Sequence, residues 1–282
     1  MRLLAWIAVA GCAAASALSL SAAGATPGEP RIVYRSVHLA NPQRPPELYS
    51  VLPSGQGRRL LVRGGEQSDW SPARRRIAFA GAGLGRAGIW VVNADGRAKR
   101  RLTRQPGDGD PTWSPDGRRI AFRRSSATSF DLWVVPAAGG TARPLLRTPV
   151  ANELAPDWSP NGKRIAFQST RGGRIQMWVL TLGSTVARRL TGVESFSPDW
   201  SPDGRRIAFM THGRIAVVDA DGRHLRLLPS GAPFSADDPA WSPDGRRIAF
   251  ERGGQVLTIR TDGRDRRYVT RAAWGTNGEP DW

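Results

Sequence analysis

A ten-residue pattern of an aromatic residue, a polar turn and an apolar strand recurs five times along the chain. The copies are WSPARRRIAF from Trp70, WSPDGRRIAF from Trp113, WSPNGKRIAF from Trp158, and WSPDGRRIAF again from Trp200 and Trp241. Successive Trp residues are 43, 45, 42 and 41 residues apart, and Trp282 follows after another 41. A period of this length, filled with short strands, predicts a repeat architecture.

Each repeat reads as four strands. One strand ends at Trp-Ser, a Pro-Asp-Gly turn follows, and Arg-Arg-Ile-Ala-Phe forms the second strand. A second turn, such as Asn93–Gly96, joins the third strand to the fourth as a hairpin. The expected third strands are Glu47–Leu52, Gly88–Asn93, Asp131–Pro136, Gln176–Thr181, Arg214–Asp219 and Gln255–Arg260. Four strands in 40–45 residues predict a propeller blade.

One repeat is divided between the two ends of the sequence. RIVY at Arg31–Tyr34 matches the second strand of a repeat, and Pro280-Asp281-Trp282 matches the first. If both lie in one blade, the ring closes without an open sheet edge, whereas an open solenoid would need capping repeats. The predicted fold is therefore all-β, a closed six-bladed β-propeller with four antiparallel strands per blade and one blade shared between the N- and C-terminal strands.

The repeated WSPDG-(R/K)RIAF motif resembles the WD-like propeller repeats of the TolB family, over about residues 29–282. The resemblance implies an exported propeller that binds a protein partner in the cell envelope. TolB proteins carry an α/β domain before the propeller, and we expect this chain to lack it. Similar propellers also precede the hydrolase domain of prolyl-oligopeptidase-like peptidases.

The N-terminal residues predict an export signal. Arg2 is followed by an uncharged apolar run that ends in Ala23-Gly24-Ala25, a small-residue cleavage site. We therefore expect a signal peptide over 1–25 and the propeller over 26–282, in the periplasm or outside the cell. Two alternatives remain, a lipid anchor on Cys12 and an uncleaved membrane anchor over 3–23.

Composition narrows the class of protein further. The 32 Gly and 22 Pro residues disfavour a helical bundle. A single Cys permits neither an intramolecular disulfide nor a zinc site built of cysteines. The formal charge of +17 suits nucleic acid or an anionic envelope surface, but export and the lack of a reader module disfavour nucleic acid. We expect a monomer.

The sequence offers little for catalysis. Gly-x-Ser-x-Gly, the nucleophile motif of serine hydrolases, does not occur. The three histidines, His38, His212 and His224, are expected on opposite faces of the ring and are interpreted as surface residues. The predicted protein is thus a non-catalytic binding module without a cofactor. The alternative is a propeller enzyme, a polysaccharide lyase or hydrolase, with a polar site at the channel mouth.

Acidic residues gather before the first strand of each repeat. Twelve of the 24 lie there, and antiparallel alternation predicts that they surround one mouth of the channel. The binding candidates at that mouth are Glu66, Asp108, Asp110, Glu153, Glu194, Asp237, Asp238, Trp274 and Glu279. Asp108 and Asp110 are also weak candidates for calcium. The aspartates before Trp (Asp69, Asp157, Asp199 and Asp281) are interpreted either as caps of a turn or as part of this mouth.

Basic residues follow the Pro-Asp-Gly turns instead. Examples are Arg74–Arg76, Lys163 and Arg164. The opposite face of the ring should therefore be basic, either as an ordinary solvated surface or as a weak contact with anionic lipid or wall polymer.

Overall fold

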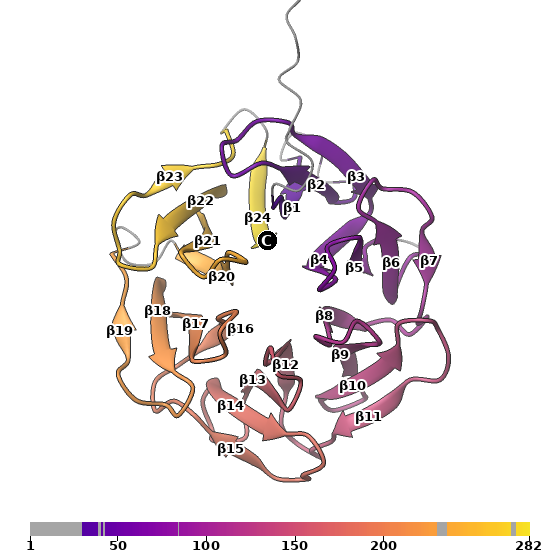
Figure 1. Cartoon of the computed structure of the whole chain (residues 1–282). Helices are drawn as coiled ribbons and strands as arrows, with labels where there is room; N and C mark the ends of the chain where they lie inside the picture. Colours follow the sequence, from indigo (N-terminus) through magenta and orange to yellow (C-terminus); the bar gives the residue numbers. More distant parts are fainter. Residues whose placement is uncertain (1–29, 39–40, 42, 84, 230–235, 272–274) are drawn as a thin grey trace, which may run out of the picture.

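Six antiparallel sheets of four strands each stand as blades around a central opening (Figure 1). The computed structural model describes residues 30–38, 41, 43–83, 85–229, 236–271 and 275–282. The six-bladed all-β prediction is confirmed. Over these residues, no helix is present that could cross a membrane.

The blades are numbered from the one shared by the two ends of the chain. Blade 1 consists of β24 (Thr276–Asp281), β1 (Ile32–Val37), β2 (Glu47–Val51) and β3 (Arg59–Arg63), and blade 2 of β4 (Gly65–Trp70), β5 (Arg76–Gly81), β6 (Ile89–Asn93) and β7 (Arg100–Arg101). Blade 3 consists of β8 (Gly109–Trp113), β9 (Arg119–Ser125), β10 (Phe130–Pro136) and β11 (Arg143–Leu146), and blade 4 of β12 (Glu153–Trp158), β13 (Arg164–Ser169), β14 (Gln176–Thr181) and β15 (Ala187–Arg189). Blade 5 consists of β16 (Phe196–Trp200), β17 (Arg206–Thr211), β18 (Arg214–Asp219) and β19 (Arg226–Leu227), and blade 6 of β20 (Ala236–Trp241), β21 (Arg247–Arg252), β22 (Gln255–Arg260) and β23 (Arg267–Tyr268).

Closure of the ring occurs as predicted, within blade 1. β24 pairs antiparallel with β1, and Val33 lies opposite Asp281 while Val37 lies opposite Thr276. The innermost strand of this blade thus comes from one end of the sequence and its neighbour from the other. All 24 strands lie within residues 32–281, so the chain from residue 30 onward contains the complete ring.

The hydrophobic core lies between adjacent blades. Ile120 and Phe122 of blade 3 are fully buried and pack against Ile89 and Val91 of blade 2, with Trp113 in the same cluster. The alternating Ile-Ala-Phe strand therefore presents large side chains to a neighbouring blade, which explains why the repeat requires a ring. The Trp residue before each turn belongs to such a cluster in every blade, so these residues serve blade packing.

Two further contacts of the repeated motif link one blade to the next. In four of the five motif copies, the guanidinium of the Arg six residues after Trp lies over the Trp ring of the following blade, 4.7–5.1 Å from the ring centroid; the pairs are Arg76–Trp113, Arg119–Trp158, Arg164–Trp200 and Arg206–Trp241. Pro115 of one turn also lies against Gly162 of the next turn. The motif thus connects successive blades as well as forming each one.

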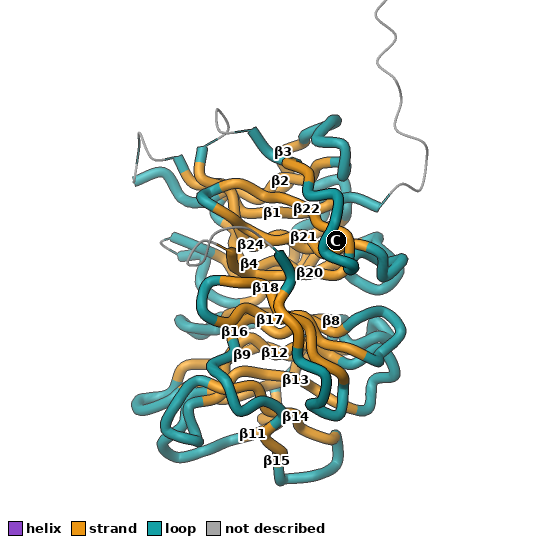
Figure 2. The backbone as a smooth tube through the Cα atoms, turned by 90° about the vertical axis from the view of Figure 1, so that its left-hand side faces the viewer, coloured by secondary structure: helices purple, strands orange, loops and turns teal. Residues whose placement is uncertain are grey.

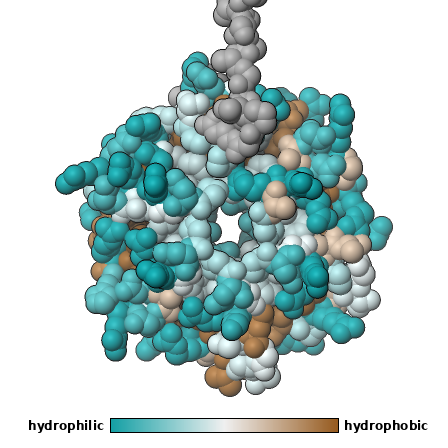
Figure 3. Space-filling model, viewed as in Figure 1, coloured by the Kyte–Doolittle hydropathy of each residue, from teal (hydrophilic) through white to brown (hydrophobic). Residues whose placement is uncertain are grey.

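The ring has two faces, visible from the edge in Figure 2. The innermost strands end at the Pro-Asp-Gly turns, and we call the side that carries these turns the turn face. The loops that lead from one blade to the next emerge on the opposite side, which we call the loop face. Trp282 marks the turn face, which is the face turned towards the viewer in Figures 1 and 3.

Candidate binding site

Every innermost strand contains a β-bulge halfway along its length. The residue three positions before Trp has a positive φ of 45–50° in all six blades, and the strand register shifts at this point. These residues, which we call the bulge ring, are Gln67, Asp110, Ala155, Ser197, Asp238 and Glu279. A bulge leaves backbone groups out of the ladder and redirects side chains. Here it frees an N–H group to bond with the neighbouring blade.

Hydrogen bonds run from blade to blade around the bulge ring. The N–H of Gln67 donates to Glu279 Oε2 at 2.8 Å, and the N–H of Asp110 donates to Gln67 Oε1 at 3.1 Å. The N–H of Ala155 donates in turn to Asp110 Oδ2 at 3.0 Å. Farther round the ring, the Ser197 hydroxyl donates to Asp238 Oδ1 at 2.8 Å. The bulge ring therefore fastens the blades together at mid-channel.

The four aspartates before Trp form a second ring, the aspartate ring, nearer the turn face. Each accepts a hydrogen bond of 2.5–2.6 Å from the backbone N–H of the Trp in the following blade; the pairs are Asp281–Trp70, Asp69–Trp113, Asp157–Trp200 and Asp199–Trp241. The interpretation that these aspartates cap a turn of their own repeat is therefore wrong. Their partners belong to the next blade, and the turns are closed by Ser and Asp side chains after the Trp, such as Ser114 and Asp116.

The two rings line a cavity of about 500 Å³ in the channel. Seven carboxyl groups contribute to its wall: those of Asp69, Asp110, Asp157, Asp199, Asp238, Glu279 and Asp281. Arg123 is the one basic side chain in the wall, and its Nε lies 2.8 Å from Asp110 Oδ2. Prolines fill most positions between the two rings, which suits a bulge because proline has no N–H to leave unpaired.

Burial controls the charge of this cavity, because it penalises the ionised form of a carboxyl group. Burial raises the pKa of Asp157 to about 7 and, against the opposing effect of Arg74, that of Asp281 to about 6. Burial together with the neighbouring aspartates raises the pKa of Asp69 and Asp199 well above the usual value. Near neutral pH the aspartate ring is therefore partly protonated.

Burial also raises the pKa values of two carboxyl groups in the bulge ring. Burial, assisted by Asp237, raises the pKa of Asp238 to about 8. Burial also raises the pKa of Glu279 to about 7, although the ion pair with Arg35 at 3.0 Å opposes the shift. Near neutral pH the cavity is consequently less negative than the count of its acidic residues suggests. It becomes more negative as the pH rises and these carboxyl groups lose their protons.

Three of the candidates from the sequence line the cavity, namely Asp110, Asp238 and Glu279. Two others are half-buried beside them. Glu66 contributes to the raised pKa of Glu279, and Asp237 Oδ1 accepts a hydrogen bond from the Asp238 N–H at 2.9 Å. Glu194 is exposed in the loop before β16, and Trp274 lies outside the described residues.

Asp108 and Glu153, expected at the mouth, lie inside blades instead. Both carboxylates bind arginines, Asp108 with Arg124 at 2.7 Å and Glu153 with Arg171 at 2.7 Å. The bulge is the reason. In a regular strand, the residue five positions before Trp and the residue one position before Trp point to the same face of the sheet. The bulge inserts one extra residue between them, so the residue five positions before Trp points to the opposite face.

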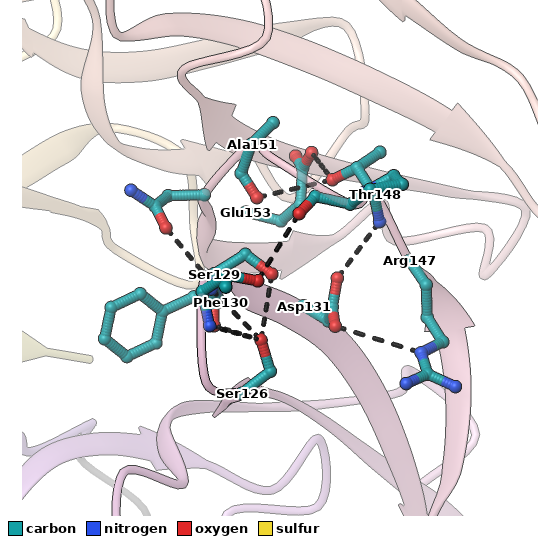
Figure 4. Close-up of polar contacts among 11 residues, drawn as sticks. Ser126, Ser129, Phe130, Asp131, Arg147, Thr148, Ala151 and Glu153 are labelled. Carbon is teal, nitrogen blue, oxygen red and sulfur yellow. Dashed lines mark hydrogen bonds and ion pairs between the residues drawn. The ribbon is translucent and has the colours of Figure 1, made fainter.

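Figure 4 shows how Glu153 is held at the junction of blades 3 and 4. Thr148 lies between two acidic side chains, donating its hydroxyl to Glu153 Oε1 at 2.8 Å and its backbone N–H to Asp131 Oδ1 at 3.0 Å. Glu153 is fully buried and Asp131 is nearly so. This cluster stabilises the loop that enters blade 4 and does not open into the channel cavity.

The structure offers little support for a metal at Asp108 and Asp110. Each carboxylate already has its own arginine partner, Arg124 or Arg123. Within the described part of the chain, no group of three His, Cys, Asp or Glu residues is arranged to hold a metal ion. The expected placement of the histidines is confirmed, because His38 and His212 lie in loop-face connections and His224 follows a turn on the opposite face.

Several cavity residues were missed in the sequence. Gln67, Ser197 and Gln168 contribute polar groups to the wall beside the carboxyls. The N–H of Ser197 donates to Gln168 Oε1 at 3.0 Å, so Gln168 from β13 replaces the side chain that Ala155 lacks. The position three before each Trp was the available signal, since it holds a polar side chain in five of the six repeats.

Comparison with known proteins identifies the family. The model described as the TolB beta propeller domain matches residues 68–282. The chain belongs to the TolB beta propeller domain family. No curated protein matches the sequence.

Solved structures share the fold of this TolB-type propeller. TolB from Acinetobacter baumannii is similar with a TM-score of 0.79 and 24% identity, over 91% of this chain and 67% of that one. A chain of a nidogen/laminin complex has a TM-score of 0.73 and 8% identity, over 89% of this chain and 98% of that one. A puromycin-hydrolyzing peptidase of Mycobacterium tuberculosis has a TM-score of 0.60 and 18% identity, over 80% of this chain and 42% of that one. At such identities the similarity shows the fold alone.

Proposed function

We propose that this TolB-type propeller is an exported, non-catalytic protein-binding module of the cell envelope. In this proposal, the channel cavity receives a basic segment of the partner. One observation carries the proposal: the cavity wall contains seven carboxyl groups and a single guanidinium, and ion pairs with Arg123 and Arg35 engage two of the seven, Asp110 and Glu279. Channel walls of low dielectric constant strengthen the field of such a cluster.

The protonation state of the cavity suits a cationic ligand. Carboxyls with pKa values of about 6–8 hold protons when the cavity is empty and release them when a fixed positive charge arrives. A lysine or arginine side chain can thus replace bound protons without leaving uncompensated buried charge. Binding should therefore strengthen as the pH rises from about 6 to 8.

Fold and family support a binding role. A propeller of similar fold occurs in the nidogen/laminin complex, which is an assembly of proteins. In the puromycin-hydrolyzing peptidase, the match covers 42% of the chain, so more than half of that protein lies outside the part similar to this one. Export rests on the apolar segment after Arg2 and its small-residue cleavage site.

Calorimetry with a short oligolysine peptide tests the proposal at pH 8. The double variant Asp238→Asn/Glu279→Gln removes two cavity carboxylates, and both replacements keep a side-chain oxygen for the hydrogen bonds from Ser197 and Gln67. We expect wild type to bind and the double variant to bind at least about tenfold more weakly. The control Asp221→Asn/Asp262→Asn removes two exposed turn-face carboxylates and should not change the affinity.

The proposed site is incorrect if the wild-type protein does not bind oligolysine at low salt. It is also incorrect if the turn-face control variant loses as much affinity as the cavity variant. Calcium is titrated in a separate arm. Binding of calcium that Asp110→Asn abolishes would support the weaker calcium hypothesis.

The raised pKa values also favour one alternative. Groups such as Asp157 and Glu279, with a pKa of about 7, are suited to general acid–base catalysis. A polysaccharide lyase or hydrolase acting at this cavity therefore remains the second candidate. Release of reducing or unsaturated sugars from polysaccharides, lost in Glu279→Gln, would favour that enzyme over the binding module.

A further inference from the structure

The turn face carries a circle of exposed basic side chains around the channel opening. We call it the turn ring, and its members each lie five residues after a Trp: Arg75, Arg118, Lys163, Arg205 and Arg246. Figure 3 looks onto this face and shows hydrophilic residues surrounding the opening. The neighbouring Arg of each motif is not available to ligands in the same way, because most of these stack on a Trp of the next blade, as Arg164 does on Trp200.

The side chains of the turn ring lack ion-pair partners among the residues that the structure describes. Arginines of the loop face differ, since Arg123, Arg124 and Arg171 each bind a carboxylate within 2.8 Å. These three arginines are therefore neutralised by acids of the same blades. The turn ring stays available to an external anion.

Acidic residues within the same turns offset only part of this charge. In Asp116, Asp203 and Asp244, Oδ1 accepts hydrogen bonds from a Ser hydroxyl and from a backbone N–H of the same turn. The turn of blade 2 has no acid, with three consecutive arginines over 74–76, and the turn of blade 4 has Asn161. Each turn thus has an excess of positive charge.

The turns fix the backbone positions from which these side chains extend. Ser201 Oγ accepts a hydrogen bond from the Arg206 N–H and donates to Asp203 Oδ1, which closes the turn that presents Arg205. Pro160 and Pro202 each lie against the glycine of the following turn. Cations that extend from rigid turns on one face of the ring suit an extended anionic surface.

The N-terminal segment joins the ring at this same face. Val33 pairs with Asp281 beside the end of β24, so the chain reaches blade 1 from the turn face.

We propose that the turn face is the membrane-facing surface of this propeller and that the turn ring contacts the phosphate groups of anionic lipids. This orientation leaves the loop face directed away from the bilayer. The proposal does not depend on what the channel cavity binds, because none of the turn-ring residues lines that cavity.

Vesicle sedimentation tests the proposal. The protein used is the chain from Thr26 onward, which contains all six blades, and its folding is verified by cooperative unfolding. It is mixed with vesicles of phosphatidylglycerol and phosphatidylcholine, or of phosphatidylcholine alone, at low and high salt. We expect binding to the phosphatidylglycerol vesicles only, with release at high salt as screening increases.

A matched pair of variants locates the contact. R75Q/R118Q/K163Q/R205Q/R246Q removes the turn ring and should weaken binding at least about tenfold. R63Q/R104Q/R147Q/R174Q/R271Q removes the same charge from the loop-face side and should change binding less than about twofold. If the first variant does not fold, R118Q/K163Q/R205Q tests three adjacent blades and should weaken binding by a smaller factor.

Three results would overturn the proposal. They are equal losses in the two variants, equal binding to both kinds of vesicle, and binding to soluble polyphosphate without binding to vesicles. The last result would indicate a soluble polyanion instead of a membrane surface.

Discussion

Ring closure predicts that Trp282 contributes as much stability as a Trp in the middle of the chain. Trp282 is 6% exposed and packs with Ile32, Tyr34 and Val51 of blade 1 and Val256 of blade 6. A buried Trp removes about 200 Å² from water, which at about 25 cal/mol per Å² corresponds to about 5 kcal/mol. Trp282→Ala, which keeps the Cβ, should therefore lower the free energy of unfolding by about 3–5 kcal/mol.

Trp200→Ala is the matched control in a blade formed by continuous sequence. Trp200 is 5% exposed, in the corresponding cluster between blades 4 and 5. It also lies under Arg164, whereas Arg247, which holds the corresponding motif position in blade 6, binds Asp265. Trp200→Ala should thus lower the free energy of unfolding by as much as Trp282→Ala does, or by up to about 1 kcal/mol more.

Urea unfolding followed by far-ultraviolet circular dichroism measures both variants. A single transition with the wild-type slope is expected for each, because loss of one blade contact destabilises the whole closed ring. The reasoning would be refuted if Trp282→Ala lost less than about 1 kcal/mol while Trp200→Ala lost the full amount. That outcome would mean that β24 detaches from blade 1 at little cost.

Three further predictions concern the cavity carboxyls, the stacking of Arg on Trp, and the missing nucleophile motif. Because burial raises the pKa of the cavity carboxyls, the folded state binds more protons than the unfolded chain between about pH 4 and 7. The free energy of unfolding should therefore fall as the pH rises across this range, by about 1.4 kcal/mol per pH unit for each retained proton. The fall should be less steep in Asp238→Asn/Glu279→Gln, which lacks two of these carboxyls. A stability that rises steadily with pH would contradict this. Arg164→Gln should cost about 1 kcal/mol in urea unfolding through its stacking on Trp200, and equal costs for Arg164→Gln and for the exposed-site control Lys163→Gln would contradict the stacking contribution. The protein should show no peptidase or esterase turnover, and labelling by a serine-reactive probe that one Ser→Ala change abolishes would contradict that.

Most of the fold was predictable because the repeat specifies it five times over. The Trp period and the strand pattern indicated the number of blades, and the expected third strands agree with the structure to within one residue at each end. The shared blade was also predictable, since Arg31–Tyr34 and Trp282 supply the two halves of one repeat.

The site was less predictable, because its contacts join residues of different repeats. Asp157 accepts from the N–H of Trp200, 43 residues away in sequence, and nothing near Asp157 indicates that partner. The bulge had a similar effect. Pro111 hints at an irregular strand, but the antiparallel order of the strands alone predicted Asp108 at the channel mouth, whereas the structure places it against Arg124.

A crystal structure of the protein with a saturating oligolysine peptide tests the central claim most directly. The account predicts peptide density in the channel cavity, with an ammonium group within hydrogen-bonding distance of Asp238 or Glu279. An empty cavity, or peptide bound only at other surfaces while the cavity contains none, would contradict it.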